Sequence, residues 1–552
     1  MKRIILIPAL CVVFLNTSNA QQKDCKQLST AFDKVLEQQF KPNETGVTVL
    51  ISKNGKIIYK RGIGMANLEL NIPMQANNVF RIGSVTKQFT AVAILQLVEK
   101  GKLNLQDEIT KFIPGYPMHG NKITIEHLLT HTSGIQDFTA IKGNANRSAI
   151  DYTPQEMIEY FKDQPMRFAP GTKWEYSNSG YFLLGYIIEH TTGKTYAQYL
   201  EENIFKPSGM NNSLYASDSR IIKHRAYGYT RGEKGFENAR YISMTQPYAA
   251  GAILSTVEDL FKWNHALRSS GLLNKEMLEK AFTKYKLNDG TKTNYGYGWR
   301  LGYIRESRSI WHGGLIDGFM AMTMYLPKED VFVAVLSNCD CKSPVDVTEK
   351  LAALAIGKPY DHKAIQLERT TLAGDTGVYE NEKAQQRIIS MSGNQLYLQL
   401  GRAPKSKITA FQKDKFFVAD DPMLTLEFAR NKDNKADKLI VHSRTANEVW
   451  TKTNKLVNAV AEIKVDEKIL ETYVGEYEIN PGFTFSITRE QDRLFLKATG
   501  QEKVEIFAEA ENKFFLKVNG AQLEFVKDNS GKITKAILTQ GNRQTDAKKI
   551  KA

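Results

Sequence analysis

The sequence lacks a long apolar segment. Its first apolar run, Ile4 to Leu15, has about 12 residues, whereas a helix needs about 20 to cross a bilayer. No later run is long and apolar enough to span one. We therefore expect no transmembrane anchor.

Cysteine is scarce, with 4 in 552 residues. Cys339 and Cys341 form a C-x-C pair, but no further ligand cluster accompanies them, and a structural zinc site needs about four donors. We therefore predict no metal site and no cofactor.

Acidic residues are fewer than basic ones. The chain has 74 Lys and Arg against 60 Asp and Glu, a formal net charge of +14. The lysines are spread along the chain, and no nucleic-acid-binding motif is present. Because the lysines are spread out and no such motif is present, we predict no nucleic-acid partner despite the positive net charge.

The beginning of the sequence has the three parts of a secretory signal peptide. Lys2 and Arg3 precede the apolar run, and Ser18-Asn19-Ala20 offers small residues for cleavage. We expect residues 1–20 to be removed and the mature protein to be periplasmic or secreted.

The first motif with chemical meaning is Ser84-Val85-Thr86-Lys87, which follows a β-like run and opens an apolar helical stretch. A serine at a helix start lies near free backbone N–H groups, and a lysine three residues on lies on the same face. Such a lysine takes the serine proton when burial or nearby positive charge lowers its pKa. Most S-x-x-K pairs are only a helix cap followed by a solvated lysine, so the motif needs support.

Two later motifs give that support. Tyr176-Ser177-Asn178 stands before an apolar helical stretch, Tyr181 to Ile188. His312-Gly313-Gly314 precedes two strand-like runs, Phe319 to Leu326 and Val331 to Leu336. Each motif is weak alone, and their order and contexts together predict one active site.

In this order the three motifs resemble the serine β-lactamase and penicillin-binding protein superfamily, on its class C β-lactamase and D-alanyl-D-alanine carboxypeptidase side. Leu128 to Ile135 and Ala250 to Thr256 look like the same family. The resemblance covers roughly residues 26–357. It implies an α+β fold in which helices flank an antiparallel sheet.

The resemblance implies a role for each motif residue. Ser84 would attack the substrate carbonyl and form an acyl-enzyme, while Lys87 lowers the barrier to losing the Ser84 proton. Tyr176 would pass a proton to the leaving group. Asn178 would hydrogen-bond the substrate or the Lys87 amine. The N–H groups of Ser84 and Leu315 would form the oxyanion hole.

His312 is where the chain departs from the family. β-Lactamases and many carboxypeptidases carry a lysine there, whose fixed charge faces the substrate carboxylate. A histidine is mostly neutral at pH 7 unless an acidic neighbour holds its proton. The H-x-G form occurs in D-aminopeptidases and esterases. We expect His312 and Gly314 to contact the substrate, His312 in a pH-sensitive way, and we do not expect efficient β-lactam hydrolysis.

The resemblance also bears on the cysteines. The family packs its N- and C-terminal helices together, and disulfides persist in an oxidising compartment. We expect Cys25 to pair with Cys339 or Cys341, and the sequence leaves the choice open.

The last part of the chain contains an internal repeat. Gly377-Val378-Tyr379-Glu380 returns as Gly475-Glu476-Tyr477-Glu478, and further matches keep this register within a residue. Short alternating apolar runs between turn residues predict antiparallel β-structure in both copies. We predict a catalytic domain at 26–357 and two β-barrel-like scaffold domains at 360–454 and 462–552, which resemble the paired barrels of some D-aminopeptidases.

Together the motifs predict an exported serine hydrolase that forms an acyl-enzyme on Ser84. Its substrate would be an amide or ester, with peptides that contain D-amino acids, such as cell-wall fragments, first among the candidates. Three alternatives stay open: an esterase or acyltransferase on the same site, a β-lactamase, and a penicillin-recognising binding or sensor protein with little turnover.

Overall fold

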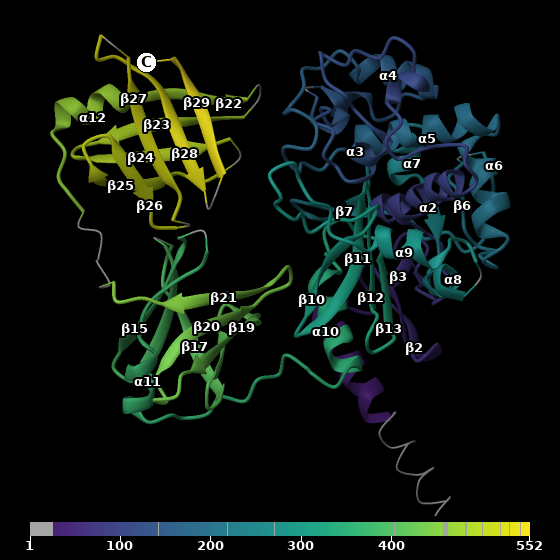
Figure 1. Cartoon of the computed structure of the whole chain (residues 1–552). Coiled ribbons are helices and arrows are strands. Elements are labelled where there is room, and N and C mark those ends of the chain that lie inside the picture. Colours follow the sequence, from purple (N-terminus) through teal and green to yellow (C-terminus); the bar gives the residue numbers. More distant parts are fainter. Residues whose placement is uncertain are drawn as a thin grey trace, which may run out of the picture. The chain divides into compact units, whose positions relative to one another are not determined.

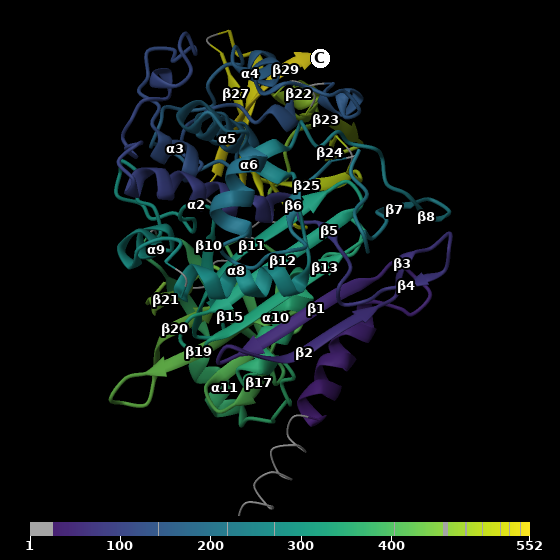
Figure 2. The same cartoon turned by 90° about the vertical axis from the view of Figure 1, so that its right-hand side faces the viewer.

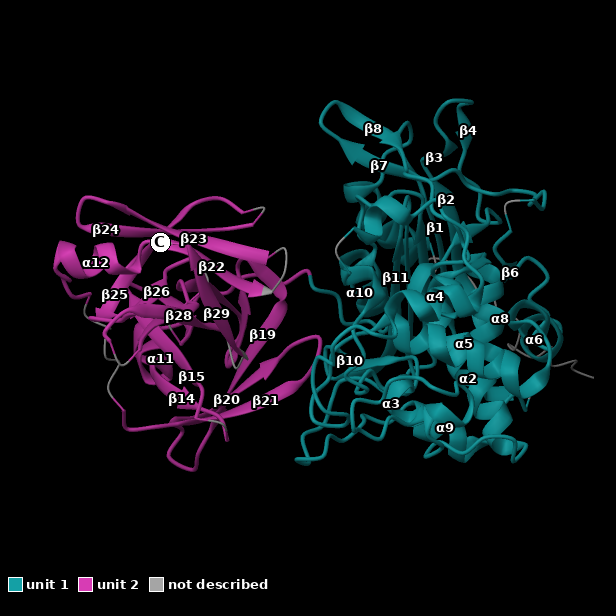
Figure 3. Ribbon diagram, turned by 90° about the horizontal axis from the view of Figure 1, so that it is seen from above, with its two compact units in different colours: residues 1–360 teal, residues 361–552 magenta. Residues whose placement is uncertain are grey.

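The computed structural model describes residues 26–551 apart from 142, 218, 270, 383, 402, 456–461, 481–482, 500, 519, 529 and 541–542. The predicted signal peptide and Cys25 lie outside the described residues. Two compact units make up the chain, Met1–Tyr360 and Asp361–Ala552 (Figure 3). Within the described residues, no helix has both the length and the apolar character that crossing a membrane requires.

Six antiparallel strands form the main sheet of the first unit, in the order β10-β11-β12-β13-β1-β2 (Figure 2). The N-terminal strand β1 pairs with β13 and so completes a sheet built mainly from residues beyond 300. The strands are β1 Val47–Lys53, β2 Lys56–Ile63, β10 Arg300–Ile304, β11 Ser307–Ile316, β12 Phe319–Leu326 and β13 Val331–Ser337.

The central strands of this sheet are buried on both faces. Successive residues of a strand point to opposite faces. In β1, Val49 and Ile51 therefore pack with the helical residues 26–39 and with α10 (Val345–Ala355), whereas Leu50 joins the larger core of the other face. The central strands β1, β12 and β13 are largely apolar because both of their faces are covered, whereas the edge strand β2 is mostly exposed.

Helix α2 (Thr86–Glu99), labelled in Figure 1, lies within the larger core and is buried from Thr86 to Leu97. A helix enclosed on all sides is mostly apolar, and α2 fits this apart from buried polar residues such as Lys87 and Gln88. The other helices of the unit are α3 Ile125–Leu129, α4 Pro154–Phe161, α5 Asn178–Thr192, α6 Tyr196–Leu200, α7 Tyr248–Gly251, α8 Val257–Ser269 and α9 Lys275–Ala281. Its short strands are β3 Met65–Asn67, β4 Ile72–Pro73, β5 Phe80–Arg81, β6 Leu214–Tyr215, β7 Tyr229–Gly232, β8 Gly235–Asn238 and β9 Ile253–Ser255.

The second unit contains two closed antiparallel barrels of eight strands, which confirms the predicted fold class. A short helix precedes each barrel, α11 Arg369–Asp375 and α12 Glu467–Tyr473. The first barrel consists of β14 Gly377–Glu380, β15 Gln386–Ser392, β16 Gln395–Leu400, β17 Ser406–Gln412, β18 Lys415–Val418, β19 Asp421–Arg430, β20 Ala436–His442 and β21 Asn447–Lys452. The second consists of β22 Gly475–Asn480, β23 Phe483–Glu490, β24 Arg493–Ala498, β25 Val504–Ala510, β26 Lys513–Leu516, β27 Gln522–Lys527, β28 Ile533–Gln540 and β29 Arg543–Lys551.

The sequence repeat has a structural counterpart in two buried tyrosines. The hydroxyl of Tyr379 donates a hydrogen bond of 2.8 Å to the backbone carbonyl of Asp375, and the hydroxyl of Tyr477 does the same to Tyr473. Both side chains are completely buried. Each tyrosine therefore fastens the helix before a barrel to that barrel.

Cys339 and Cys341 form a disulfide with each other. The prediction that Cys25 pairs with one of them is therefore wrong. The two cysteines follow β13 closely, and their Cα atoms are 5.1 Å apart, within the span that a disulfide requires. Local turn geometry thus brings the nearest thiols together.

Candidate active site

Ser84 lies in a single 3-10 turn, η1 (Gly83–Val85), between β5 and α2. Gly83 has φ of +50°, a conformation that favours glycine. A Cβ at Gly83 would lie 3.0 Å from the backbone nitrogen of Leu315 in β11. The chain therefore turns sharply against β11 and holds Ser84 at the N-terminus of a buried helix, close to the predicted position.

Lys87 is completely buried in the first turn of α2. Its Nζ lies 3.1 Å from Oγ of Ser84, 2.8 Å from Oδ1 of Asn178 and 2.8 Å from the carbonyl oxygen of Ala250. A neutral amine has two N–H groups, which suit the two carbonyl-type oxygens, and one lone pair, which is left for the Ser84 hydroxyl. The contacts of Lys87 thus match those of a general base.

The electrostatics of the site favour that neutral amine. Burial lowers the pKa of Lys87 to about 7. The charge of Asp137 acts in the opposite direction, and that of Arg300 lowers the pKa further. A substantial fraction of Lys87 is therefore ready to accept a proton near neutral pH.

Tyr176 lies beside both residues. The Lys87 amine is 4.7 Å from the centroid of the Tyr176 ring, and the Tyr176 hydroxyl lies near Ser84. Burial raises the pKa of Tyr176 above its usual value, although the nearby Ser84 hydroxyl and the charge of Arg300 oppose this. Tyr176 consequently keeps its proton at neutral pH and is available as a proton donor.

Asn178 begins α5 and connects Lys87 to a carboxylate. Its Oδ1 accepts the hydrogen bond from Lys87, and its Nδ2 donates to Oδ2 of Asp137 at 3.0 Å. The motif predicts that Asn178 hydrogen-bonds either the substrate or the Lys87 amine, and the structure contains the hydrogen bond with Lys87. The sequence motifs did not single out Asp137, which lies in the loop after α3.

The close approach of β11 to Ser84 depends on Gly314. A Cβ at this position would lie 2.0 Å from the carbonyl oxygen of Ile82 and 3.1 Å from the backbone nitrogen of Ser84. A side chain is therefore excluded there. The amides of Ser84 and Leu315, the predicted oxyanion hole, lie on these two closely packed segments.

His312 is buried in β11, with Nε2 2.9 Å from the hydroxyl of Tyr295 and Nδ1 2.6 Å from the carbonyl oxygen of Gly313. Burial lowers its pKa well below the usual value, and the charges of Lys87 and Arg300 act in the same direction. Burial and these charges therefore favour the neutral imidazole, which argues against the predicted pH-sensitive contact.

Arg300, in β10, is a cation of the site that the motifs missed. Its guanidinium carbon lies 5.5 to 6.0 Å from the ring centroids of Trp174, Tyr176, Tyr295 and Trp311. Such stacking stabilises a cation. The available sequence signal was the glycine- and aromatic-rich run that ends at Arg300.

His131 packs against the Tyr176–Asn178 segment and holds it in place. Its Nδ1 accepts a hydrogen bond of 3.1 Å from the backbone N–H of Ser177, and its ring centroid is 4.3 Å from that of Tyr176. Burial lowers its pKa well below the usual value. His131 is therefore a neutral positioning residue.

A cavity of about 280 Å³ opens beside Ser84 and Asn178. Phe138 and Leu315 give it apolar walls, and an ion pair of 3.0 Å between Arg240 and Asp317 lies at its border. The volume suits a small molecule or one end of a peptide. Across the described ranges, no group of three or more His, Cys, Asp or Glu side chains could hold a metal ion.

The fold and the site define a protein of the β-lactamase and transpeptidase type. A family model described as Beta-lactamase matches residues 32–357, and one described as Domain of unknown function (DUF3471) matches residues 460–551. Because the first match spans more than half of the chain, the protein belongs to the β-lactamase family. The predicted superfamily is confirmed.

Three relatives show how far the likeness extends. Penicillin-binding protein 4* of Bacillus subtilis (strain 168) is 26% identical over 525 residues, which are 92% of this chain and 94% of the relative. The octameric penicillin-binding protein homologue from Pyrococcus abyssi has a TM-score of 0.53 at 28% identity, over 78% of this chain and all of that structure. D-amino acid amidase from Ochrobactrum anthropi SV3 has a TM-score of 0.54 at 25% identity, over 60% of this chain and 99% of the amidase. The protein is thus a serine hydrolase of this family.

Proposed function

We propose that the protein is an exported amidohydrolase that cleaves peptides or amides containing D-amino acids through an acyl-enzyme on Ser84. One observation carries this proposal: a buried lysine amine with a pKa of about 7 contacts the serine hydroxyl. A hydroxyl needs such a base to attack a carbonyl carbon.

In acylation, neutral Lys87 accepts the Ser84 proton while Oγ bonds to the substrate carbonyl carbon. The resulting oxyanion accepts hydrogen bonds from the N–H groups of Ser84 and Leu315, each worth about 3 kcal/mol. Tyr176 then donates its proton to the leaving nitrogen, the C–N bond breaks, and the Lys87 ammonium restores the Tyr176 proton.

In deacylation, water attacks the ester carbonyl and loses a proton to the same basic network. The tetrahedral intermediate collapses, the bond to Oγ breaks, and Ser84 recovers its proton from Lys87. The products are a carboxylic acid and the free enzyme. Asn178 and the Ala250 carbonyl hold the Lys87 amine in place throughout the cycle.

Two observations support an amide with a D-amino acid over a β-lactam. The D-amino acid amidase from Ochrobactrum anthropi SV3 shares this fold over almost its whole length. The neutral His312 stands where β-lactamases carry a lysine, so this position offers no fixed charge to a β-lactam carboxylate.

The substrate proposal is tested with D-alanine 4-nitroanilide, its L-enantiomer, 4-nitrophenyl acetate and nitrocefin, with Ser84→Ala as the control for each. We expect the D-amide to be hydrolysed at least about tenfold faster than the L-amide, since a chiral pocket discriminates in kcat/KM. Cleavage of the acetate ester alone would favour an esterase or acyltransferase. Rapid loss of nitrocefin would favour a β-lactamase.

Export is tested separately by N-terminal sequencing of the protein from fractionated cells that express the full chain. We expect an extracytoplasmic protein that begins at Gln21, because Ser18-Asn19-Ala20 forms the cleavage site. A cytoplasmic protein that retains residues 1–20 would contradict export and would leave the catalytic proposal unaffected.

A further inference from the structure

A second, larger cavity lies away from Ser84. Its volume is about 700 Å³, it is open to solvent on one side, and residues of α8, α9, β11 and β12 line it. Cavities that bind small ligands commonly measure about 300 to 1,000 Å³. None of the predicted catalytic residues lines it, so it requires its own explanation.

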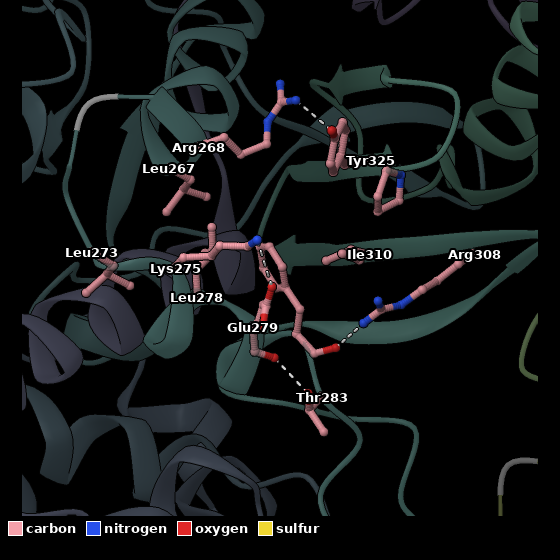
Figure 4. A pocket seen from close by; sticks show the side chains of 12 residues that line it. Leu267, Arg268, Leu273, Lys275, Leu278, Glu279, Thr283, Arg308, Ile310 and Tyr325 are labelled. Atoms are coloured by element: carbon pink, nitrogen blue, oxygen red, sulfur yellow. Dashed lines mark hydrogen bonds and ion pairs between the residues drawn. The ribbon is translucent and has the colours of Figure 1, made fainter.

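The walls of this cavity are largely apolar. Leu267, Leu273 and Leu278 lie on one side and Ile310 on the strand opposite, with Tyr325 nearby (Figure 4). An apolar chain placed between these side chains would lose contact with water, which is the main driving force for burial. The walls therefore favour an aliphatic or aromatic ligand group.

Two of the cations on the lining are already compensated. Arg268 forms an ion pair of 2.7 Å with Asp330 and a hydrogen bond of 2.6 Å with the hydroxyl of Tyr325. Lys275 lies 3.8 Å from Glu279, and both side chains are strongly exposed. Neither cation needs a ligand.

Arg308 differs from them. Its guanidinium donates a hydrogen bond to the backbone carbonyl of Phe282, and among the described residues no carboxylate forms an ion pair with it. Burial lowers the pKa of the neighbouring Lys284, and the charges of Lys292 and Arg308 lower it further. Arg308 and Lys284 therefore add positive charge beside the cavity, whose lining also carries one carboxylate, Glu279, next to Lys275.

We propose that this cavity binds an amphipathic anion, with an aliphatic chain between the leucines and Ile310 and a terminal carboxylate on Arg308. The guanidinium fork matches a carboxylate in geometry and charge. The proposal is independent of the chemistry at Ser84.

Sodium decanoate, titrated below its micelle concentration into the mature chain, tests this by calorimetry. We expect one molecule to bind per chain and Arg308→Glu to weaken binding at least about tenfold, since a charge-assisted contact is reversed. Arg308→Lys keeps the positive charge and should weaken binding less than Arg308→Glu does. Arg369→Glu, at an exposed arginine of the second unit, serves as the matched control and leaves binding unchanged.

Two results would overturn the proposal. One is the absence of decanoate binding to the wild-type chain. The other is equal affinity for Arg308→Glu and Arg369→Glu, which would place the anion elsewhere. Because the Arg308 side chain is exposed, thermal unfolding should show that Arg308→Glu folds normally. The decyltrimethylammonium cation, with the same chain and the opposite charge, should bind more weakly than decanoate.

Discussion

The amine of Lys87 lies 3.1 Å from the hydroxyl of Ser84, and the lysine side chain is entirely withdrawn from water. These two facts belong together, because a solvated lysine would carry a proton near pH 7 and could not accept another. The position of Lys87 in the first turn of a helix buried on all sides produces both the contact and the lowered pKa.

The pH dependence of catalysis should follow the charges around Lys87. Activity requires the neutral amine, so kcat/KM rises as the pH increases through the Lys87 pKa. Arg300 lowers this pKa and Asp137 raises it. Arg300→Gln should therefore move the rise to higher pH, and Asp137→Asn should move it to lower pH.

Profiles of kcat/KM between pH 5 and 10, measured for both variants and the wild type, check these directions. Each variant serves as the control for the other, since general damage to the site would lower the rate without shifting the two curves in opposite directions. Unshifted curves, or shifts in one common direction, would mean that Lys87 is not the titrating base.

A methyl group at Gly314 should damage the site. Its Cβ would collide with the backbone of Ile82, and overpacking of this kind costs about 1–3 kcal/mol of stability. Displacing one oxyanion-hole donor lowers kcat by about 100-fold or more. We expect Gly314→Ala to show both effects in thermal unfolding and steady-state kinetics.

Gly313→Ala is the matched control for that variant. A Cβ at Gly313 would meet its nearest neighbour, Sδ of Met322, at 3.6 Å, an ordinary contact. This substitution should leave kcat within about threefold of the wild-type value, since it removes no catalytic hydrogen-bond donor. Similar losses in the two glycine variants would contradict the role given to Gly314.

Removing the hydroxyl group of either barrel tyrosine should lower the stability of the protein by a similar amount. Tyr379→Phe and Tyr477→Phe each leave a backbone carbonyl without its hydroxyl donor, which costs about 1–3 kcal/mol. Denaturant unfolding should show the loss, and hydrolysis at Ser84 should be unchanged. Tyr397→Phe is the control, because within the described residues the Tyr397 hydroxyl makes no hydrogen bond. An equal loss in Tyr397→Phe would refute the fastening role.

The sequence predicts those parts of the structure that depend on a local pattern of residues. The S-x-x-K spacing places two side chains on one helix face whatever surrounds the helix, and the two-residue period of the tail predicts antiparallel barrels. The contact between Lys87 and Ser84 and the two eight-stranded barrels agree with these patterns.

What the sequence does not reveal depends on packing between distant segments. Asp137, in the loop after α3, and Arg300, in β10, influence Lys87 only because these segments lie near the start of α2 in the folded unit. The histidine at 312 was predicted to make a pH-sensitive contact, but its burial, which no motif records, favours the neutral form. The disulfide between Cys339 and Cys341 depends on the turn after β13 rather than on the packing of the terminal helices.

The central claim is that Ser84 forms the acyl-enzyme. Intact-protein mass spectra of acid-quenched reactions with the 4-nitrophenyl ester of N-acetyl-D-alanine test it most directly. We predict one acyl group on the wild-type chain, located by peptide mapping on the segment that contains Ser84, and none on a normally folded Ser84→Ala variant. An acyl group on that variant, or on another residue of the wild type, would contradict the account.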